Sequence, residues 1–390
     1  MKNYDVVIIG AGLAGLQCAR LLGAKGAKVL LVDRKTDLSK GIHTTGIFVR
    51  KTLEDFDFPA GSLGKPIANV TLYSPQLKAF DLASEKEEFR VGRMALIYDE
   101  FLQESVTDGV RFARATSYKS AEISNGETVV KLEKRGEISE VKTKILIGAD
   151  GANSRVAKDL KLDENREFIV GYEEVFRAKK TNREPRLHCF LDAKLAPGYL
   201  AWIADDGVEI HIGIGGYAAD FNPREALKLF KEKTVKLFDT SELELTETRG
   251  GRIPVGGVLR RIANEHGLLI GDAAGAVSPL TAGGLDPAMR LSTFAADIVW
   301  KSLRTENPKV LLDYSGEKFR ARFVSRLWMR RIIRTFTNQR LLELGHSFLR
   351  GRLGSTFAKH VFFGRGSFPD VQISERLSVN NYQLSKDSKN

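Results

Sequence analysis

An apolar run followed at once by closely spaced glycines opens this chain, and it constrains the fold more than any other feature. Tyr4 to Ile9 predicts a buried strand, and Gly10, Gly12 and Gly15 follow it in the spacing G-x-G-x-x-G. Glycines at this spacing allow a tight turn from strand to helix and let a pyrophosphate approach the backbone at the helix N-terminus. A second apolar strand, Lys28 to Val32, completes a βαβ unit and predicts a parallel sheet.

An acidic residue stands where such a unit requires one. Asp33 ends the second strand and lies 18 residues after Gly15, close to the ~20 at which an acid accepts hydrogen bonds from the ribose of a dinucleotide. A loop carboxylate that only caps the following turn is the alternative, and the preceding glycines make it the weaker one. The opening therefore predicts a dinucleotide site without saying which dinucleotide binds.

Two more glycine-rich turns follow predicted strands. Gly148 to Val156 (GADGANSRV) comes after Ile145 to Ile147, and Gly271 to Gly275 (GDAAG) comes after Leu268 to Ile270. With the first turn they stand in the order found on one FAD-binding domain, and the chain resembles the FAD-dependent, p-hydroxybenzoate hydroxylase-like flavoprotein monooxygenase superfamily. The resemblance implies non-covalently bound FAD.

The resemblance also assigns residues to the cofactor. It implies that Asp272 binds a ribityl hydroxyl and that Arg93 lies against the cofactor. Backbone N–H groups of Gly284 and Leu285 would face the N1/O2 edge of the flavin, where a helix N-terminus stabilises negative charge by about 0.3–2 kcal/mol. The implied cofactor-binding residues are Gly10, Gly12, Ala14, Gly15, Asp33, Arg34, Thr44, Thr45, Gly46, Arg93, Asp150, Gly151, Gly271, Asp272, Gly283, Gly284 and Leu285.

Within this superfamily the chain resembles the geranylgeranyl reductases. Gly275 stands where the aromatic hydroxylases usually carry histidine. Tyr199 and Trp202 resemble the aromatic residues of the reductases' PxxYxW strand, although two residues separate them here instead of one. Thr44 occupies the place of a flavin-contacting cysteine, so chemistry assigned to that cysteine does not carry over. Tyr199, Trp202 and His43 are the candidate substrate-cavity residues. For Tyr199 or Trp202 taken singly, ordinary packing of a strand is the more common explanation, and His43 is also explained as a loop histidine with its hydrogen bonds satisfied.

The resemblance implies an FAD-dependent oxidoreductase. Flavin N5 would deliver hydride to isolated C=C bonds of a prenyl (geranylgeranyl-type) lipid, with NAD(P)H or ferredoxin as external reductant. A flavin monooxygenase that hydroxylates an apolar or aromatic substrate through a C4a-hydroperoxide is the alternative, and a non-enzymatic prenyl-binding escort protein is a more distant one. No side chain is assignable as a catalytic acid or base, and no spacing typical of metal ligands is present.

The predicted fold is α/β. A discontinuous Rossmann-like FAD-binding domain of the glutathione reductase type is joined by an α+β substrate domain with an antiparallel sheet and by a C-terminal helical region. The expected bounds are 1–65, 90–165 and 252–310 for the FAD-binding domain, 66–89 and 166–251 for the substrate domain, 311–377 for the basic helical region and 378–390 for a disordered tail.

Positive charge is concentrated near the C-terminus. The segment 318–365 contains 12 basic residues and one acid, Glu343, so it carries the whole chain's net charge of +11. Apolar residues such as Phe323, Leu327 and Ile332 interleave at helical spacing. A basic amphipathic helix indicates an anionic membrane surface, to which each Lys or Arg contributes about 1 kcal/mol; a solvated helical face is the alternative. Nucleic acid is not expected, because no recognition motif accompanies the charge.

Cysteine use and hydropathy bear on the compartment. Cys18 and Cys189 are the only cysteines and cannot form a disulfide framework, which indicates a reducing compartment. The longest weakly charged stretch, 267–289, contains Asp272 and Asp286 and does not resemble a membrane span. No cleavable signal sequence is recognisable at the start. We expect a cytoplasmic protein, peripheral at the inner membrane face.

Overall fold

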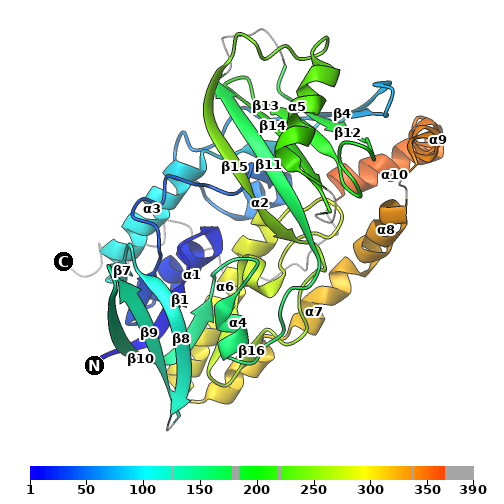
Figure 1. Cartoon of the computed structure of the whole chain (residues 1–390). Coiled ribbons are helices and arrows are strands. Elements are labelled where there is room, and N and C mark those ends of the chain that lie inside the picture. Colours follow the sequence, from blue (N-terminus) through cyan, green and yellow to red (C-terminus); the bar gives the residue numbers. More distant parts are fainter. Residues whose placement is uncertain (125, 178–183, 218–220, 336–337, 365–390) are drawn as a thin grey trace.

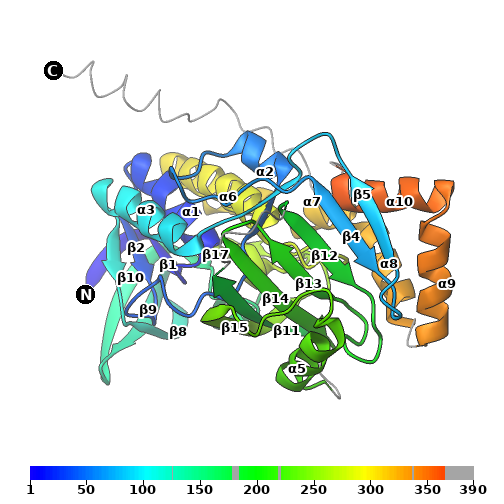
Figure 2. The same cartoon turned by 90° about the horizontal axis from the view of Figure 1, so that it is seen from above.

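The computed structural model describes residues 1–124, 126–177, 184–217, 221–335 and 338–364 (Figure 1). Two large β-sheets lie in different halves of the molecule, and a third sheet has only two strands. Helices from the last part of the chain run along the second large sheet (Figures 1 and 2). The tail predicted over 378–390 lies outside the described residues.

The first sheet is built around the strand that opens the chain. β1 (Lys2–Ile9) pairs in parallel with β2 (Val29–Val32) and β10 (Glu137–Gly148). The predicted βαβ unit is therefore present, and its strands are almost fully buried because both faces of the parallel part are covered. The other strands of this sheet are β7 (Arg111–Ala113), β8 (Ser117–Ser124), β9 (Glu127–Lys134), β16 (Ala263–Asn264) and β17 (Gly267–Leu269).

Helices join the first sheet to the motifs. α1 (Leu13–Ala24) packs against both α3 (Met94–Thr107) and α6 (Leu285–Thr305), and the three lie together in Figure 2. Because β1, β10 and β17 are parallel, their carboxyl ends and the three glycine-rich turns meet at one edge. Shorter elements complete this half: α2 (Arg50–Asp55), α4 (Arg155–Asp159), β3 (Ile47–Val49), β6 (Phe89–Val91) and the 3₁₀ helices Gly271–Ala274 and Pro308–Asp313.

The second sheet has seven strands in the order β15-β11-β14-β13-β12-β4-β5. All its neighbouring strands are antiparallel except the pair β12 and β4, which is parallel. α5 (Pro223–Thr234) packs on β11 and β14. The strand bounds are β4 (Asn69–Tyr73), β5 (Ala79–Ala83), β11 (Phe168–Arg177), β12 (Arg186–Phe190), β13 (Ala201–Asp205), β14 (Glu209–Gly216) and β15 (Glu244–Pro254).

The basic segment is helical where it is described. It comprises α7 (Gly316–Arg320), a 3₁₀ turn (Ala321–Phe323), α8 (Val324–Thr335), α9 (Gln339–Leu349) and α10 (Arg352–Phe363). α10 lies beside β5, and its buried Ala358 joins the apolar cluster under β4 and β12 (Figure 2). Within the described ranges, no helix combines the length and the apolar character needed to cross a membrane.

Candidate functional site

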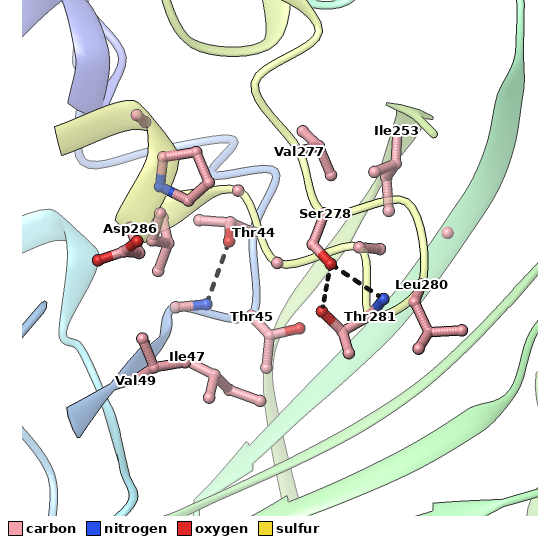
Figure 3. A pocket seen from close by; sticks show the side chains of 18 of the residues that line it. Thr44, Thr45, Ile47, Val49, Ile253, Val277, Ser278, Leu280, Thr281 and Asp286 are labelled. Carbon is pink, nitrogen blue, oxygen red and sulfur yellow. Dashed lines mark hydrogen bonds between the residues drawn. The ribbon is translucent and has the colours of Figure 1, made fainter. Parts of the chain in front are cut away.

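A cavity of about 830 Å³ lies between the two sheets and the C-terminal helices. This volume is at the upper end of the roughly 300–1,000 Å³ typical of small-molecule sites. Residues of all three glycine-rich turns line it, together with the segment 42–47, strands of the second sheet, and α8, α9 and α10. Figure 3 shows part of it, where Thr44 and Thr45 lie opposite the segment that leads from Val277 to Asp286.

The three glycines of the opening turn have different surroundings. A Cβ atom on Gly10, which has φ +106°, would lie 2.2 Å from the carbonyl oxygen of Ala149, and one on Gly15 would lie 1.9 Å from that of Gly10. Both glycines therefore serve backbone packing. For Gly12, no atom of the described residues lies within 4 Å of the added Cβ, and Gly12 lines the cavity. The N-terminus of α1 thus faces open space that a phosphate can enter.

Asp33 connects this turn to the cavity. One carboxylate oxygen accepts the Ala11 N–H at 2.7 Å, and the other accepts the Lys35 N–H at 2.7 Å. Each carboxylate oxygen has a second lone pair, so Asp33 can still accept a hydroxyl hydrogen bond. Asp33, Ala14 and Lys35 line the cavity, whereas the exposed Arg34 is outside the set of described residues that do so. Sequence reasoning did not identify Lys35.

Asp150 acts on its own loop. Its carboxylate accepts hydrogen bonds from the Ser154 hydroxyl at 2.6 Å and from the N–H groups of Arg155 and Val156 at 2.7 and 3.2 Å, so it caps α4. Gly151, with φ +82°, lines the cavity, but Asp150 is absent from the described residues that line it. The structure therefore gives Asp150 a supporting position behind Gly151 instead of a position in the cavity wall.

Asp272 is half-buried and lines the cavity. Burial raises its pKa from 3.8 to about 6. Within the described part of the chain, no group donates a hydrogen bond to this carboxylate, although its backbone carbonyl accepts one from Asn165 Nδ2 at 2.8 Å. A hydroxyl-rich ligand would supply the missing donors, since a desolvated carboxylate without hydrogen bonds is costly.

The turn before α6 lies next to Asp272. Gly271, Gly283, Gly284 and Leu285 all line the cavity. A Cβ atom on Gly284 would lie 3.5 Å from Asp272 Oδ1, so the two residues are neighbours. α6 begins at Leu285, and no side chain of the described residues caps its N-terminus by a hydrogen bond.

The segment 43–46 is held by the second sheet. His43 Nδ1 lies 2.9 Å from the carbonyl oxygen of Gly250. Thr45 Oγ1 donates a short hydrogen bond to Glu173, and Arg249 donates to the Thr44 carbonyl at 2.7 Å. Thr44 Oγ1 in turn accepts the Gly46 N–H at 3.2 Å, as Figure 3 shows. All these residues line the cavity.

The two candidate aromatic residues also face the cavity. The Tyr199 hydroxyl donates to the carbonyl oxygen of Thr281 at 2.7 Å, and Trp202 Nε1 donates to Glu173 at 2.9 Å. Their rings make an edge contact with centroids 6.5 Å apart. Sequence reasoning missed Glu173 and Arg249. The signal that could have indicated Glu173 is its place on the inward-facing positions of β11, where alternation predicts an apolar residue.

Arg93 is placed differently from what the resemblance implied. Its guanidinium pairs with Asp206 at 2.7 Å and with Glu209 at 3.0 Å, and it is not one of the described residues that line the cavity. The carboxylates of Asp206, in the β13–β14 connection, and of Glu209, at the start of β14, hold it there, since charge-assisted pairs fix an arginine in place. Arg93 therefore links the two halves of the protein.

The far part of the cavity is mainly apolar, although Arg326 and Arg330 of α8 also line the cavity. Side chains of the C-terminal helices form one wall, and side chains of β4 and β12 form the other. The first wall comprises Phe323, Met329, Ile333, Leu349, Phe357, Val361 and Phe362, and the second comprises Leu72, Leu187 and Cys189. Burial raises the pKa of the Cys189 thiol to about 12, so this cysteine acts as an apolar residue.

Known proteins resemble this chain along most of its length. The family model described as FAD binding domain matches residues 3–62 and 96–330. Digeranylgeranylglycerophospholipid reductase 3 of Methanosphaera stadtmanae is 27% identical over 331 residues, which is 82% of this chain and 81% of that protein. Geranylgeranyl diphosphate reductase of Rhodobacter capsulatus is 27% identical over 318 residues, 78% of this chain and 77% of the relative.

Solved structures show the same fold. The crystal structure of a geranylgeranyl bacteriochlorophyll reductase-like protein from Thermoplasma acidophilum superimposes with a TM-score of 0.80 at 18% identity. The superposition covers 94% of this chain and 98% of the other.

Proposed function

This chain belongs to the FAD binding domain family and is an FAD-dependent oxidoreductase, and from this premise we propose that it reduces isolated C=C bonds of a geranylgeranyl-type prenyl lipid. The resemblance to geranylgeranyl reductases is confirmed by the names of its relatives. When bound and reduced, FAD supplies the hydride for such a reduction.

The observation that supports the proposal most strongly is that a single cavity has a glycine-rich end and an apolar end. The glycine-rich end fits FAD, because Gly12 leaves open space beside a helix N-terminus and Asp272 presents a carboxylate that lacks a protein donor. Gly12, Asp33, Gly151, Asp272 and Gly284 would hold the cofactor there. Tyr199 and Trp202 line the same cavity and would position the reacting bond.

The apolar end supports a prenyl chain as substrate. Aliphatic and aromatic side chains line it on both sides, so an apolar chain placed there loses much of its contact with water. At about 0.8 kcal/mol per carbon, burial of a 20-carbon chain contributes at most ~16 kcal/mol. Segments 66–89 and 166–251, which contain the strands β4, β5 and β11–β14, would form the substrate domain beside a glutathione reductase-type FAD domain (1–65, 90–165 and 252–310).

Access from a membrane is supported by the surface at this end. Ile332 and Phe357 line the cavity and are also exposed, at 55% and 49%. Trp328 on α8 and Leu353 on α10 are 60% and 79% exposed. Arg352 and Lys359 are exposed on α10, and the exposed Arg350 lies between α9 and α10. This combination is typical of helices that lie on an anionic membrane surface. The protein would act peripherally at the inner membrane face and take its lipid directly into the cavity.

The test is a single turnover without oxygen. The FAD-loaded protein is photoreduced and mixed with digeranylgeranylglycerophospholipid, and the flavin absorbance and lipid mass are followed. We expect the flavin to reoxidise and the lipid to gain two hydrogens per turnover. A reduced flavin that stays reduced and an unchanged lipid would overturn the proposal. If oxygen is then required and a hydroxylated product appears, the protein is a monooxygenase; a colourless protein that binds lipid would be an escort.

A further inference from the structure

Three ionisable side chains on the neighbouring strands β11 and β14 form a row from the cavity toward the surface. Glu173 on β11 lies 3.1 Å from His211 Nδ1 on β14, and His211 Nε2 lies 3.4 Å from Glu209 on the same strand. The side chains of Glu173 and His211 are 4% and 1% exposed, whereas that of Glu209 is 30% exposed. The row therefore connects a buried end to a solvent-contacting end.

The buried end of this row reaches the cavity. Glu173 lines it and accepts hydrogen bonds from the Thr45 hydroxyl and from Trp202 Nε1. Thr45 belongs to the segment 43–46, beside the turn that precedes α6 (Figure 3). A proton that reached Thr45 would thus arrive where the glycine-rich and the apolar ends of the cavity meet.

The charges around His211 favour its protonated form. Glu173 from β11 and Glu209 from β14 face it, and Arg249 from β15 contacts Glu173 at 3.7 Å. Burial alone would lower the pKa of His211, but the two carboxylates outweigh burial and raise it. Two of the positive charges nearby are already neutralised, because Arg249 pairs with Glu247 and Arg93 pairs with Asp206 and Glu209.

We propose that Glu209, His211 and Glu173 form a proton path that ends at the hydroxyl of Thr45. The inference rests on the proposed function, in which one carbon of the double bond gains a hydride from the reduced cofactor and its neighbour gains a proton. His211 passes its Nδ1 proton to Glu173. The Thr45 hydroxyl, which donates to Glu173 in the structure, turns toward the substrate, gives its proton to the new C–H bond and takes a proton from Glu173. His211 is then neutral, with its remaining proton on Nε2, which lies 3.4 Å from Glu209 without a hydrogen bond in the described residues. When the ring turns over, its bare nitrogen takes a proton that Glu209 carries from solvent, so each side chain ends as it began.

Such a path would supply the proton that the reaction consumes. Reduction of an isolated double bond consumes one proton per turnover, and a cavity filled by a prenyl chain excludes the water that would otherwise provide it. A side chain positioned to transfer a proton typically accelerates a reaction by about 10²–10⁴-fold.

Glu173→Gln tests the path, because it keeps the shape of the side chain and removes its ability to relay a proton. Glu174→Gln is the matched control, since Glu174 is the next residue on β11 and pairs with Lys231 at 2.6 Å on the other face of the sheet. We expect E173Q to slow anaerobic reoxidation of the reduced protein by prenyl lipid by about 10²-fold, E173D to restore part of the rate, and E174Q to react at the wild-type rate.

Two further readouts separate proton transfer from a structural role. In wild-type protein the reoxidation rate should fall as pH rises through the His211 pKa, and it should slow in D₂O; E173Q should lose this pH dependence. In the oxidised FAD-loaded protein, NMR titration should show a lower His211 pKa in E173Q, because its carboxylate partner is gone. If E173Q does not retain FAD, Glu209→Gln at the exposed end takes its place with the same readouts.

The outcomes distinguish this inference from the proposed function. If wild-type protein is not reoxidised by prenyl lipid, the proposed function fails. If wild-type protein is reoxidised and E173Q matches it in rate and pH profile, the proton path is wrong while the reductase remains.

Discussion

At its first-sheet end the cavity is lined mainly by backbone from three turns, and at its other end it is lined by side chains from α8, α9, α10 and the second sheet. At the first end, Gly10 and Gly15 leave no room for even a methyl group. At the second end, many aliphatic and aromatic side chains together form the walls. The difference suggests that the shape of the cofactor site is rigidly specified, whereas the chain-binding end can change its lining and still bury an apolar ligand.

The largest expected effects come from substitutions in the opening turn, where Gly15 and Gly12 should respond differently. Gly15→Ala should destabilise the protein by more than about 3 kcal/mol, because its Cβ would overlap the backbone of Gly10. Gly12→Ala should leave the stability of FAD-free protein nearly unchanged and weaken FAD binding at least about tenfold, because its Cβ meets open cavity. Urea unfolding and fluorescence titration with FAD measure the two effects. Equal destabilisation by both variants would contradict the assignment.

The next test uses the charge of Asp272. Its pKa rises from 3.8 to about 6 in the folded protein, so the folded state binds a proton that the unfolded state has lost between these values. FAD-free protein should therefore lose up to ~3 kcal/mol of stability as pH rises from about 4 to 6. Asp272→Asn should lack this loss, and bound FAD should reduce it. The unfolding free energies of wild-type protein and Asp272→Asn are measured across this pH range. If their difference does not change with pH, the raised pKa of Asp272 is contradicted.

Removal of positive charge from α10 tests whether the surface at the apolar end binds membranes. Arg352→Gln with Lys359→Gln should weaken binding to anionic vesicles by about 2 kcal/mol, or roughly 30-fold at low salt, with FAD affinity unchanged. Lys228→Gln with Lys236→Gln, on and just after α5, removes the same charge from exposed positions elsewhere. Vesicle co-sedimentation compares the two pairs. If the control pair weakens binding equally, the effect is one of net charge and not of this surface.

The smallest expected effect lies at the border between the two ends. Tyr199→Phe removes the hydrogen bond to the Thr281 carbonyl and leaves that acceptor without its partner, at a cost of about 1 kcal/mol. Denaturant unfolding of the FAD-loaded protein measures it. Because the ring remains, we expect lipid binding to change little; a large loss of lipid affinity would show that the hydroxyl itself contacts the ligand.

Sequence reasoning named more of the residues that line the glycine-rich end of the cavity than of those that line the apolar end, for a physical reason. Gly10, Gly15 and Gly151 are required by local backbone geometry, so their spacing can be recognised in one dimension. Glu173 and His211 become partners only when β11 and β14 pair in a particular register, which no local pattern specifies. The resemblance implied that Arg93 lies against the cofactor. Its guanidinium pairs with two carboxylates that only the folding of the second sheet brings near it, and the sequence does not show these partners.

Native mass spectrometry of the FAD-loaded protein with a geranylgeranyl lipid tests most directly whether both ends are used together. We predict one FAD and one lipid bound to the same protein molecule, with the lipid lost when Met329 and Ile333 are replaced by glutamate and FAD retained. Displacement of FAD by the lipid, or lipid binding unaffected by these substitutions, would contradict a shared cavity with separate cofactor and lipid ends.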